Sequence, residues 1–499
     1  MLSGEAAEQT GQSWLFHHGA RTVSDLPNSR RLRILRELDV IGRPCLIVLM
    51  AAGGIASAPA AAKPGLLAAA ISAPSDLTIT ATVRTRVETI DNQFRPNTAQ
   101  TDTIVAVRTT LAAEYDAGPV RFGGEVWDSR VYAEVANSSV GTTEVNTLEP
   151  IQAYAKVELG DWAKGAKGGK GLLTFGRFTM DVGSRRLAAR SRFRNTTNAF
   201  TGANAEWTTA GGTRLFGFWT MPQIRRPDDR DGIQNNSVKF DLETTGVQFF
   251  GGHITAPDVL GGTYEAGLFR LAEQDSADRL TRNRRLWTPN LRLFARPTTG
   301  KWDHDLEGAY QFGKVRRSAA ASDLADADVS AWFVHAEAGY TFASGWKPRL
   351  SASFDGASGD GGAPGKFGRF DTLFGARRFD FGPTSLFGPI GRANIVTPGA
   401  RVELAPGKRT DAMLGYRAIW AQNARDTLSS TGVRDASGRS GSFAGHQIEA
   451  RLRHWLVPDL LQAEAGGAVL AKGPLLRNAP NAPNSGSTVY GYFDLTLML

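Results

Sequence analysis

The sequence predicts an all-β fold, a single transmembrane antiparallel β-barrel of about 18 strands with an aqueous, arginine-rich lumen. Three observations support this fold class. Segments in which apolar and polar residues alternate recur along most of the chain, the connections between them alternate in length, and the last residues form another such segment. Beyond the N-terminal region, no apolar run approaches the length of a transmembrane helix.

The first 62 residues predict a leader that contains a secretory signal peptide. Arginines between Arg30 and Arg43 precede an apolar core at about residues 45–56, and small residues follow it. Ala56-Ser57-Ala58 and Ala60-Ala61-Ala62 are alternative cleavage sites. The core is short and glycine-rich for a membrane span, although a retained anchor helix is the alternative.

The barrel domain is then expected over residues 63–499. The single cysteine, Cys45, lies within the leader. Cleavage after Ala62 would therefore leave a mature chain without disulfides or thiol chemistry.

The first strand is expected to begin at Leu77. Apolar residues such as Val83 and Val87 occupy one face, and Arg84, Arg86 and Glu88 occupy the other. The same alternation recurs in residues 105–115, 152–159, 291–296, 332–342 and 447–453. A soluble sandwich would also alternate, but so many strongly charged second faces favour a closed barrel with lipid outside and water inside.

Short and long connections follow one another. Short turns are expected at residues 116–118, 343–345 and 457–459, and long loops at residues 92–101, 179–198, 225–236, 357–392 and 426–443. Outer-membrane barrels have short periplasmic turns and long outer loops. The final strand alternates up to Leu499. Outer-membrane barrels usually end on an aromatic residue, so the terminal leucine departs from their pattern.

The densest positive charge lies between Arg177 and Arg194. This segment contains Arg177, Arg185, Arg186, Arg190, Arg192 and Arg194, and its only acid is Asp181. Guanidinium groups bind carboxylates and phosphates through two parallel hydrogen bonds. One interpretation is a solvated loop. The other, which the arginine-rich flanking strands favour, is a segment that lines the narrowest part of a pore and binds anions.

Charged residues on the expected lumenal faces extend this hypothesis. The pore arginines would be Arg84, Arg86, Arg108, Arg292, Arg349 and Arg451, and the pore acids Glu88, Glu114, Glu158, Glu307 and Glu449. Their neighbours Val83, Val107, Leu293, Leu350 and Leu452 should face lipid. For any single strand arginine, ordinary cross-strand pairing on a wet wall is the simpler explanation.

The chain resembles the alginate export family of outer-membrane barrels over nearly all of its expected mature length. The matching stretches are Gln152-Ala153-Tyr154, Phe175-Gly176-Arg177, Gly183-Ser184-Arg185-Arg186-Leu187 with its continuation to Arg194-Asn195, and residues 305–313, 338–342, 357–360 and 370–375. The resemblance implies a monomeric 18-stranded barrel in the outer membrane of a diderm bacterium. It also implies an arginine-rich constriction, containing Arg177, Arg185, Arg186, Arg190 and Arg194, through which an anionic polysaccharide leaves the cell.

The expected partners are an alginate-like polysaccharide or another anionic solute, outer-membrane lipid, and periplasmic export proteins. The formal net charge is +8, but an exported protein rarely meets nucleic acid, so none is expected. A general anion porin that imports small acids is the first alternative function. An outer-membrane enzyme is the second, and a receptor or purely structural barrel the third.

No catalytic residue, metal site or cofactor is expected. The histidines are scattered, without H-x-x-x-H spacing, and no G-x-S-x-G motif with plausible partners occurs.

Overall fold

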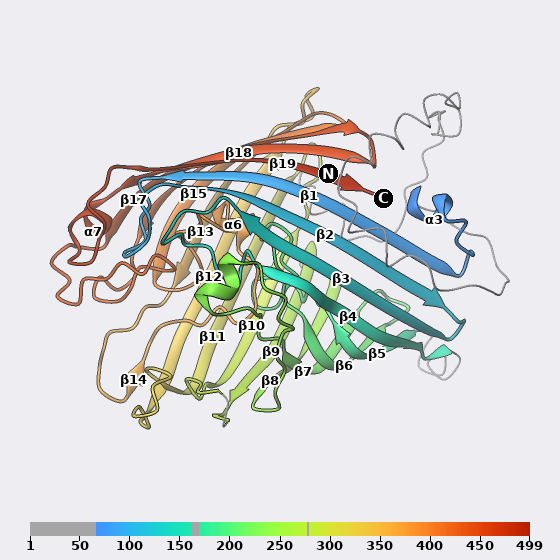
Figure 1. The fold of residues 1–499 in the computed structure, drawn as a ribbon, viewed down its shortest axis with the longest axis horizontal. Helices are drawn as coiled ribbons and strands as arrows, with labels where there is room; N and C mark the ends of the chain where they lie inside the picture. Colours follow the sequence, from blue (N-terminus) through green and yellow to red (C-terminus); the bar gives the residue numbers. More distant parts are fainter. Residues whose placement is uncertain (1–65, 161–168, 277–278) are drawn as a thin grey trace.

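A computed structural model describes residues 66–160, 169–276 and 279–499. Within these ranges, 18 strands form a closed antiparallel barrel, because the first strand pairs with both the second and the last (Figure 1). The prediction of an all-β barrel of this size is confirmed. The expected leader and its cleavage sites lie outside the described residues. None of the described helices is long and apolar enough to cross a membrane.

The strands follow one another around the wall in chain order. They are β1 (Leu77–Asp91), β2 (Asp102–Asp116), β3 (Val120–Tyr132), β4 (Asn146–Glu158), β5 (Lys170–Phe178), β6 (Phe200–Thr208), β7 (Arg214–Pro222), β8 (Val247–Val259), β9 (Gly262–Glu273), β10 (Arg285–Ala295), β11 (Trp302–Arg316), β12 (Asp326–Thr341), β13 (Arg349–Ala357), β15 (Ile395–Gly407), β16 (Thr410–Trp420), β17 (Phe443–Val457), β18 (Leu461–Lys472) and β19 (Thr488–Met498). A short additional strand, β14 (Lys366–Phe367), pairs in parallel with β12 and lies outside the antiparallel series.

Four short helices accompany the barrel. Helix α3 (Leu66–Ala70) precedes β1, α5 (Arg230–Gln234) lies between β7 and β8, α6 (Arg378–Phe381) lies between β14 and β15, and α7 (Pro474–Asn478) lies between β18 and β19. Each is five residues long or shorter. Such helices are too short to be stable without tertiary contacts, so their positions depend on packing.

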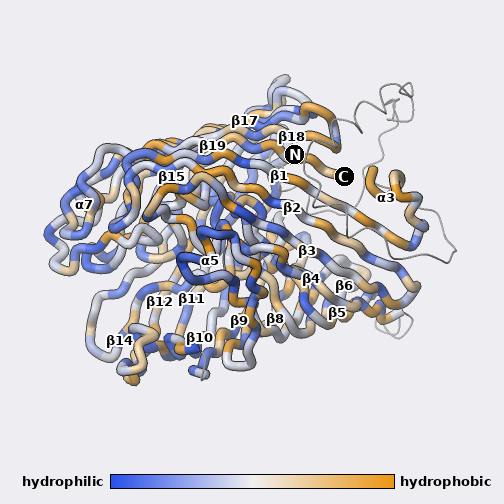
Figure 2. The backbone as a smooth tube through the Cα atoms, viewed as in Figure 1, coloured by the Kyte–Doolittle hydropathy of each residue, from blue (hydrophilic) through white to orange (hydrophobic). Residues whose placement is uncertain are grey.

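Side-chain alternation explains why the strands form this wall. In β1, Arg84 and Arg86 are buried, whereas Val87 is 43% exposed. The same two-residue period is visible as alternating hydrophobic and hydrophilic colour along many strands in Figure 2. The apolar rows therefore face outward, toward lipid, and the polar rows face the lumen.

The two ends of the barrel differ. Short turns join β2 to β3, β8 to β9 and β17 to β18 at one end, and β19 also ends there. The long connections emerge at the opposite end, which carries α7 and β14 (Figure 1). The expected alternation of short turns and long loops is thus present, and the long-loop end is the outer one by analogy with other outer-membrane barrels.

Several long loops fold into the lumen rather than away from the barrel. Phe374, in the loop before α6, packs on Phe200 and Phe249 with ring centroids 5.5 and 4.9 Å apart. Phe387, in the loop after α6, stacks on Tyr490 of β19 at 5.3 Å. These aromatic contacts belong to one continuous buried apolar cluster. The lumen at the long-loop end is therefore packed with loop side chains.

Candidate functional site

The loop between β5 and β6, residues 179–199, crosses the inside of the barrel. Arg86 of β1 donates to the Phe193 carbonyl at 2.8 Å, and the Ser129 hydroxyl of β3 donates to the Asn195 carbonyl at 2.7 Å. The amide of Asn198 donates to the Phe374 carbonyl at 2.9 Å. The arginine-rich segment is thus held between the wall and a second inward loop, residues 358–394.

Arg186 is the most extensively paired residue of this segment. Its guanidinium lies 2.7 Å from Glu307, 3.1 Å from Asp305 and 3.0 Å from Asp380. Two of these acids come from β11 and the third from α6. Asp380 also pairs with Arg392. Arg186 and Arg392 hold the pKa of the Asp380 carboxyl well below its usual range, although burial alone would raise it.

The neighbouring arginines are paired as well. Arg190 forms a two-pronged ion pair with Glu125 of β3, with distances of 2.6 and 2.8 Å. Arg185 lies 3.2 Å from Asp181. Arg177 is the last-but-one residue of β5 and pairs with Glu149 at 2.6 Å. The next residue of the strand, Phe178, faces inward and belongs to the buried apolar cluster. The side chain of Arg177 therefore belongs to the wall rather than to the inward loop.

These pairs correct one expectation. The sequence suggested that the positive charge between Arg177 and Arg194 is uncompensated, because Asp181 is its only acid. In the structure, Glu125, Glu149, Asp305, Glu307 and Asp380 neutralise much of it. The error has a simple cause: these acids lie far away in the sequence and reach the segment only because the barrel closes.

The strand arginines predicted to face the lumen are on inward rows, next to lumenal partners. Arg84 donates to the carbonyls of the inward loop, as does Arg108, whose guanidinium also lies 4.5 Å from the centre of the Trp127 ring. Arg86 pairs with Asp494 at 2.7 Å. The remaining pairs are Arg292 with Asp305 and Glu265, Arg349 with Asp303, Glu337 and Glu403, and Arg451 with Asp411.

The predicted pore acids divide into two kinds, those that hold inward loops and those that pair with other residues of the wall. Glu307 is buried against Arg186, and Glu88 accepts from the hydroxyl of Tyr490 at 2.8 Å. Glu114 accepts from Tyr154 and Lys156, and Glu158 pairs with Arg121 near the short-turn end. Glu449 lies 3.8 Å from Arg378 on α6. The acids therefore fasten loops or pair along the wall.

Four arginines from four different loops, including Arg194 of the arginine-rich segment, have no carboxylate partner among the described residues. We call Arg95, Arg194, Arg225 and Arg377 the loop arginine cluster. None of them lies within 4 Å of a carboxylate of the described residues; they donate instead to backbone carbonyls and neutral side chains. Of these four arginines, only Arg194 was predicted from the sequence to line the pore. The other three carried a weak signal, since each lies in an expected long loop.

The members of this cluster repel one another. Burial, together with Arg225 and Arg377, lowers the pKa of Arg194 to about 9. Burial and Arg377 lower the pKa of Arg95 to about 10. Glu144 is the one carboxylate that acts on all four guanidinium groups, and it acts from a distance. An entering anion would therefore relieve repulsion here.

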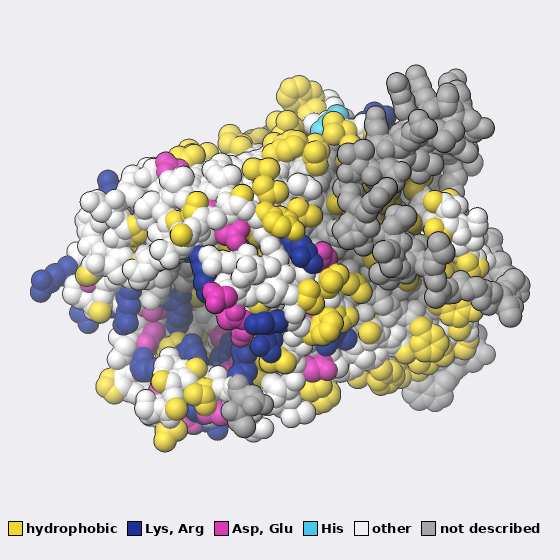
Figure 3. All heavy atoms as spheres, viewed as in Figure 1, with side chains coloured by type: hydrophobic (Ala, Val, Ile, Leu, Met, Phe, Trp, Pro, Cys, Tyr) yellow, Lys and Arg dark blue, Asp and Glu magenta, His cyan; other side chains and the backbone are white. Residues whose placement is uncertain are grey.

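A cavity of about 1200 Å³ occupies the lumen between the inward loops and the short-turn end. Its lining includes Arg185, Arg186 and Arg192 from the loop and Arg292, Arg349 and Arg401 from the strands. Nine lysines or arginines and eight acids line it altogether. Figure 3 shows basic and acidic side chains side by side in a hollow of the face in view. The polar chamber is nearly balanced in charge, which suits a hydrated path.

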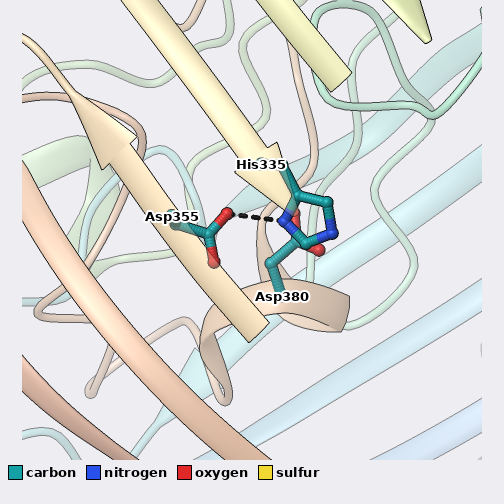
Figure 4. A group of neighbouring side chains, drawn as sticks. All are labelled: His335, Asp355 and Asp380. Carbon is teal, nitrogen blue, oxygen red and sulfur yellow. Dashed lines mark hydrogen bonds and ion pairs between the residues drawn. The ribbon is translucent and has the colours of Figure 1, made fainter. Parts of the chain in front are cut away.

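One buried group has the residue types of a metal site. His335, Asp355 and Asp380 each offer a ligand atom, and these atoms lie within 4.8 Å of one another. However, His335 Nδ1 lies 2.8 Å from Asp355, as drawn in Figure 4, and both oxygens of Asp380 accept from Arg186. The guanidinium groups already supply the positive charge that a metal would bring, so the group is a polar network.

A family model described as alginate export matches residues 75–489. This chain belongs to the alginate export family. No protein of curated function matches its sequence significantly.

Solved structures with the same fold are outer-membrane proteins. OccK8 (OprE) of Pseudomonas aeruginosa superposes with a TM-score of 0.54 at 12% identity, over 85% of this chain and 98% of that one. OccAB1 of Acinetobacter baumannii gives 0.53 at 11% identity, over 85% and 97%. OccK2 (OpdF) of Pseudomonas aeruginosa, solved in complex with glucuronate, gives 0.52 at 13% identity, over 85% and 96%.

The family and these neighbours place the protein in the bacterial outer membrane, as a solute channel rather than an enzyme. Membership in the family agrees with the resemblance seen in the sequence. The membrane location also explains the exposed apolar rows of the wall, since lipid covers them.

Proposed function

We propose that this channel carries an anionic polysaccharide of the uronate class out of the cell, through a path that the loop arginine cluster makes electropositive. The observation that carries the proposal is the cluster itself: Arg95, Arg194, Arg225 and Arg377 are close enough to repel one another and have no carboxylate partner among the described residues. A uronate polymer has a carboxylate on every sugar, so successive sugars can occupy such a site in turn.

The surrounding lumen supports weak rather than tight binding. The predicted pore residues Arg186, Arg190 and Arg292 are already paired with acids of the protein. A carboxylate of the solute would therefore share each guanidinium with the acid that already binds it. Conduction requires sites that are favourable enough to enter and weak enough to leave. In this proposal the paired arginines form shallow sites along the path, and the loop cluster provides the selective one.

A second candidate is a general anion porin that imports small acids. The glucuronate complex of OccK2 (OpdF) favours it, because glucuronate is a single sugar with one carboxylate. The two candidates differ in how the channel responds to chain length. A polysaccharide channel should be blocked progressively more strongly by longer uronate oligomers, whereas a small-acid porin should respond mainly to the monomer.

We further propose that the barrel is a monomer. Light scattering of the detergent-solubilised protein measures its mass and tests this proposal.

The test is conductance in a planar bilayer with a salt gradient. Arg194→Gln combined with Arg377→Gln should move the reversal potential away from anion preference and weaken block by uronate oligomers. A matched control is Arg434→Gln combined with Arg439→Gln, which removes the same charge from exposed positions of a long loop. An unchanged reversal potential in the first variant, with an intact barrel, would refute the role of the cluster.

A further inference from the structure

An arginine interrupts an aromatic row on the outward face of the barrel. The outward residues in register across β7 to β11 are Trp219, Phe250, Arg270, Trp287 and Phe312. Arg270 lies between inward-facing Phe269 and Leu271, which are buried, so its own side chain points outward. Aromatic rows of this kind mark the interface between the hydrocarbon and the headgroups. The row lies in the part of the strands nearest the long loops.

Arg270 has no acidic partner among the residues that the structure describes. Its guanidinium lies 5.1 Å from the centre of the Trp287 ring, and no described carboxylate lies within 4 Å of it. Two further basic residues, Arg285 and Lys314, face each other in the next outward row toward the long loops. Arg285 pairs with Asp326, and Lys314 lies 2.9 Å from Asp328. The patch therefore contains three cations, and no acid of the described residues compensates the charge of Arg270.

An apolar groove lies directly below this patch, toward the short-turn end. Its volume is about 750 Å³, and its outward lining includes Leu215, Gly217, Gly252, Ala266 and Leu268. Gly217 and Gly252 face each other in register, and Leu268 adjoins Gly252. Because two neighbouring positions lack side chains, the wall is recessed between the flanking leucines. Leu215 and Leu268 are exposed, which places the groove on the lipid-facing side.

We propose that this face binds one phosphorylated lipid of the outer leaflet, with a phosphate on Arg270 and Arg285 and an acyl chain in the groove. The charge is complementary, since the outer leaflet is rich in phosphorylated glycolipid and the patch lacks one counter-charge. The depths agree too: the cations lie at the interfacial row, and the groove lies in the hydrocarbon beside it. An arginine facing lipid is tolerated near the interface, where an anionic headgroup reaches it. This site is independent of the solute that passes through the lumen.

The test uses native mass spectrometry of the purified barrel with diphosphoryl lipid A, and with the same lipid after removal of its phosphates. Wild type should retain the phosphorylated form. Arg270→Gln combined with Arg285→Gln should lower that retention by about tenfold or more and leave the dephosphorylated form unchanged. Gly252→Leu should weaken retention of both forms, because the added side chain would fill the groove; a Cβ at this position meets no atom closer than 3.9 Å.

Lys301→Gln combined with Lys347→Gln is the matched control, since it removes two exposed positive charges at the short-turn end. Equal retention of the phosphorylated lipid by wild type and the arginine variant would overturn the proposal. So would complete displacement of the lipid by inorganic phosphate, which would show a site for free anions. If the arginine variant does not fold, Gly252→Leu provides the test: retention of the lipid at the wild-type level in this variant would also overturn the proposal.

Discussion

Arg186 and Asp380 form a two-pronged ion pair inside the lumen, with Nε–Oδ2 and Nη2–Oδ1 distances of 3.0 Å each, although they are 194 residues apart in the chain. The pair joins the two inward loops to each other. Glu307 and Asp305 join the same guanidinium to β11. One arginine thus fastens both loops to the wall.

Replacing Arg186 by glutamine should release the inward loops. The change leaves Glu307 and Asp380 buried without their main counter-charge, and breaking a buried pair from one side costs about 3–5 kcal/mol. Hydrogen exchange in residues 179–199 should become faster while exchange in the strands stays slow. Arg214→Gln is the control, because Arg214 is half-exposed and its pair with Glu206 contributes at most about 1 kcal/mol. Unchanged protection of residues 179–199 from hydrogen exchange would contradict the role of Arg186 in holding the inward loops.

Replacing Gly375 by alanine should disturb the same crossing. A Cβ at this position would overlap the carbonyl oxygen and carbon of Arg186, which are backbone atoms and cannot rotate away. The two loops must then separate, and open-channel current noise should increase. Gly361→Ala, in the same loop, provides the control, since its Cβ would meet only an amide nitrogen at 3.6 Å. Equal noise in both variants would argue against close contact of the loops.

The fold was accessible from the sequence because lipid enforces a local rule. Every strand must show lipid an apolar face, so the pattern in residues 77–88 or 447–453 is readable without knowing any partner. The candidate site was less accessible. Arg186 was recognisable as one of a cluster, but its pairing with Glu307 and Asp380 depends on closure of the barrel. Arg95, Arg225 and Arg377 could not be grouped with Arg194, since four separate loops bring them together.

The assignment of outward-facing residues can be tested by placing an arginine at two different membrane depths on the outward face of one strand. Ile448 and Leu456 both lie on the exposed row of β17, Ile448 in the middle and Leu456 near the short turn. Ile448→Arg should destabilise the barrel by about 2–4 kcal/mol, and Leu456→Arg by no more than about 1 kcal/mol, because the cost of a lipid-facing arginine falls toward the interface. Equilibrium unfolding in lipid vesicles measures both values. Equal costs would show that the assigned membrane position is wrong.

Anion preference should not change between about pH 6.5 and pH 8. Burial and neighbouring arginines lower the pKa values of Arg194 and Arg377 to about 9 and about 10, but a cation stays protonated below its pKa. Free carboxylates are ionised throughout this window. Reversal potentials measured across it should therefore coincide. A marked change would mean that a group titrating near neutrality, such as a histidine, sets the selectivity.

The contacts of Arg86 have a consequence for assembly. Arg86 lies on the first strand, pairs with Asp494 on the last strand directly across the closing seam, and also donates to the Phe193 carbonyl of the inward loop. Asp494 reaches Arg86 only after the first and last strands have joined. During insertion, the seam must therefore close before the loop acquires its complete anchor. A barrel still open at its side has an unfinished interior, so the permeation path cannot be complete until the wall is closed.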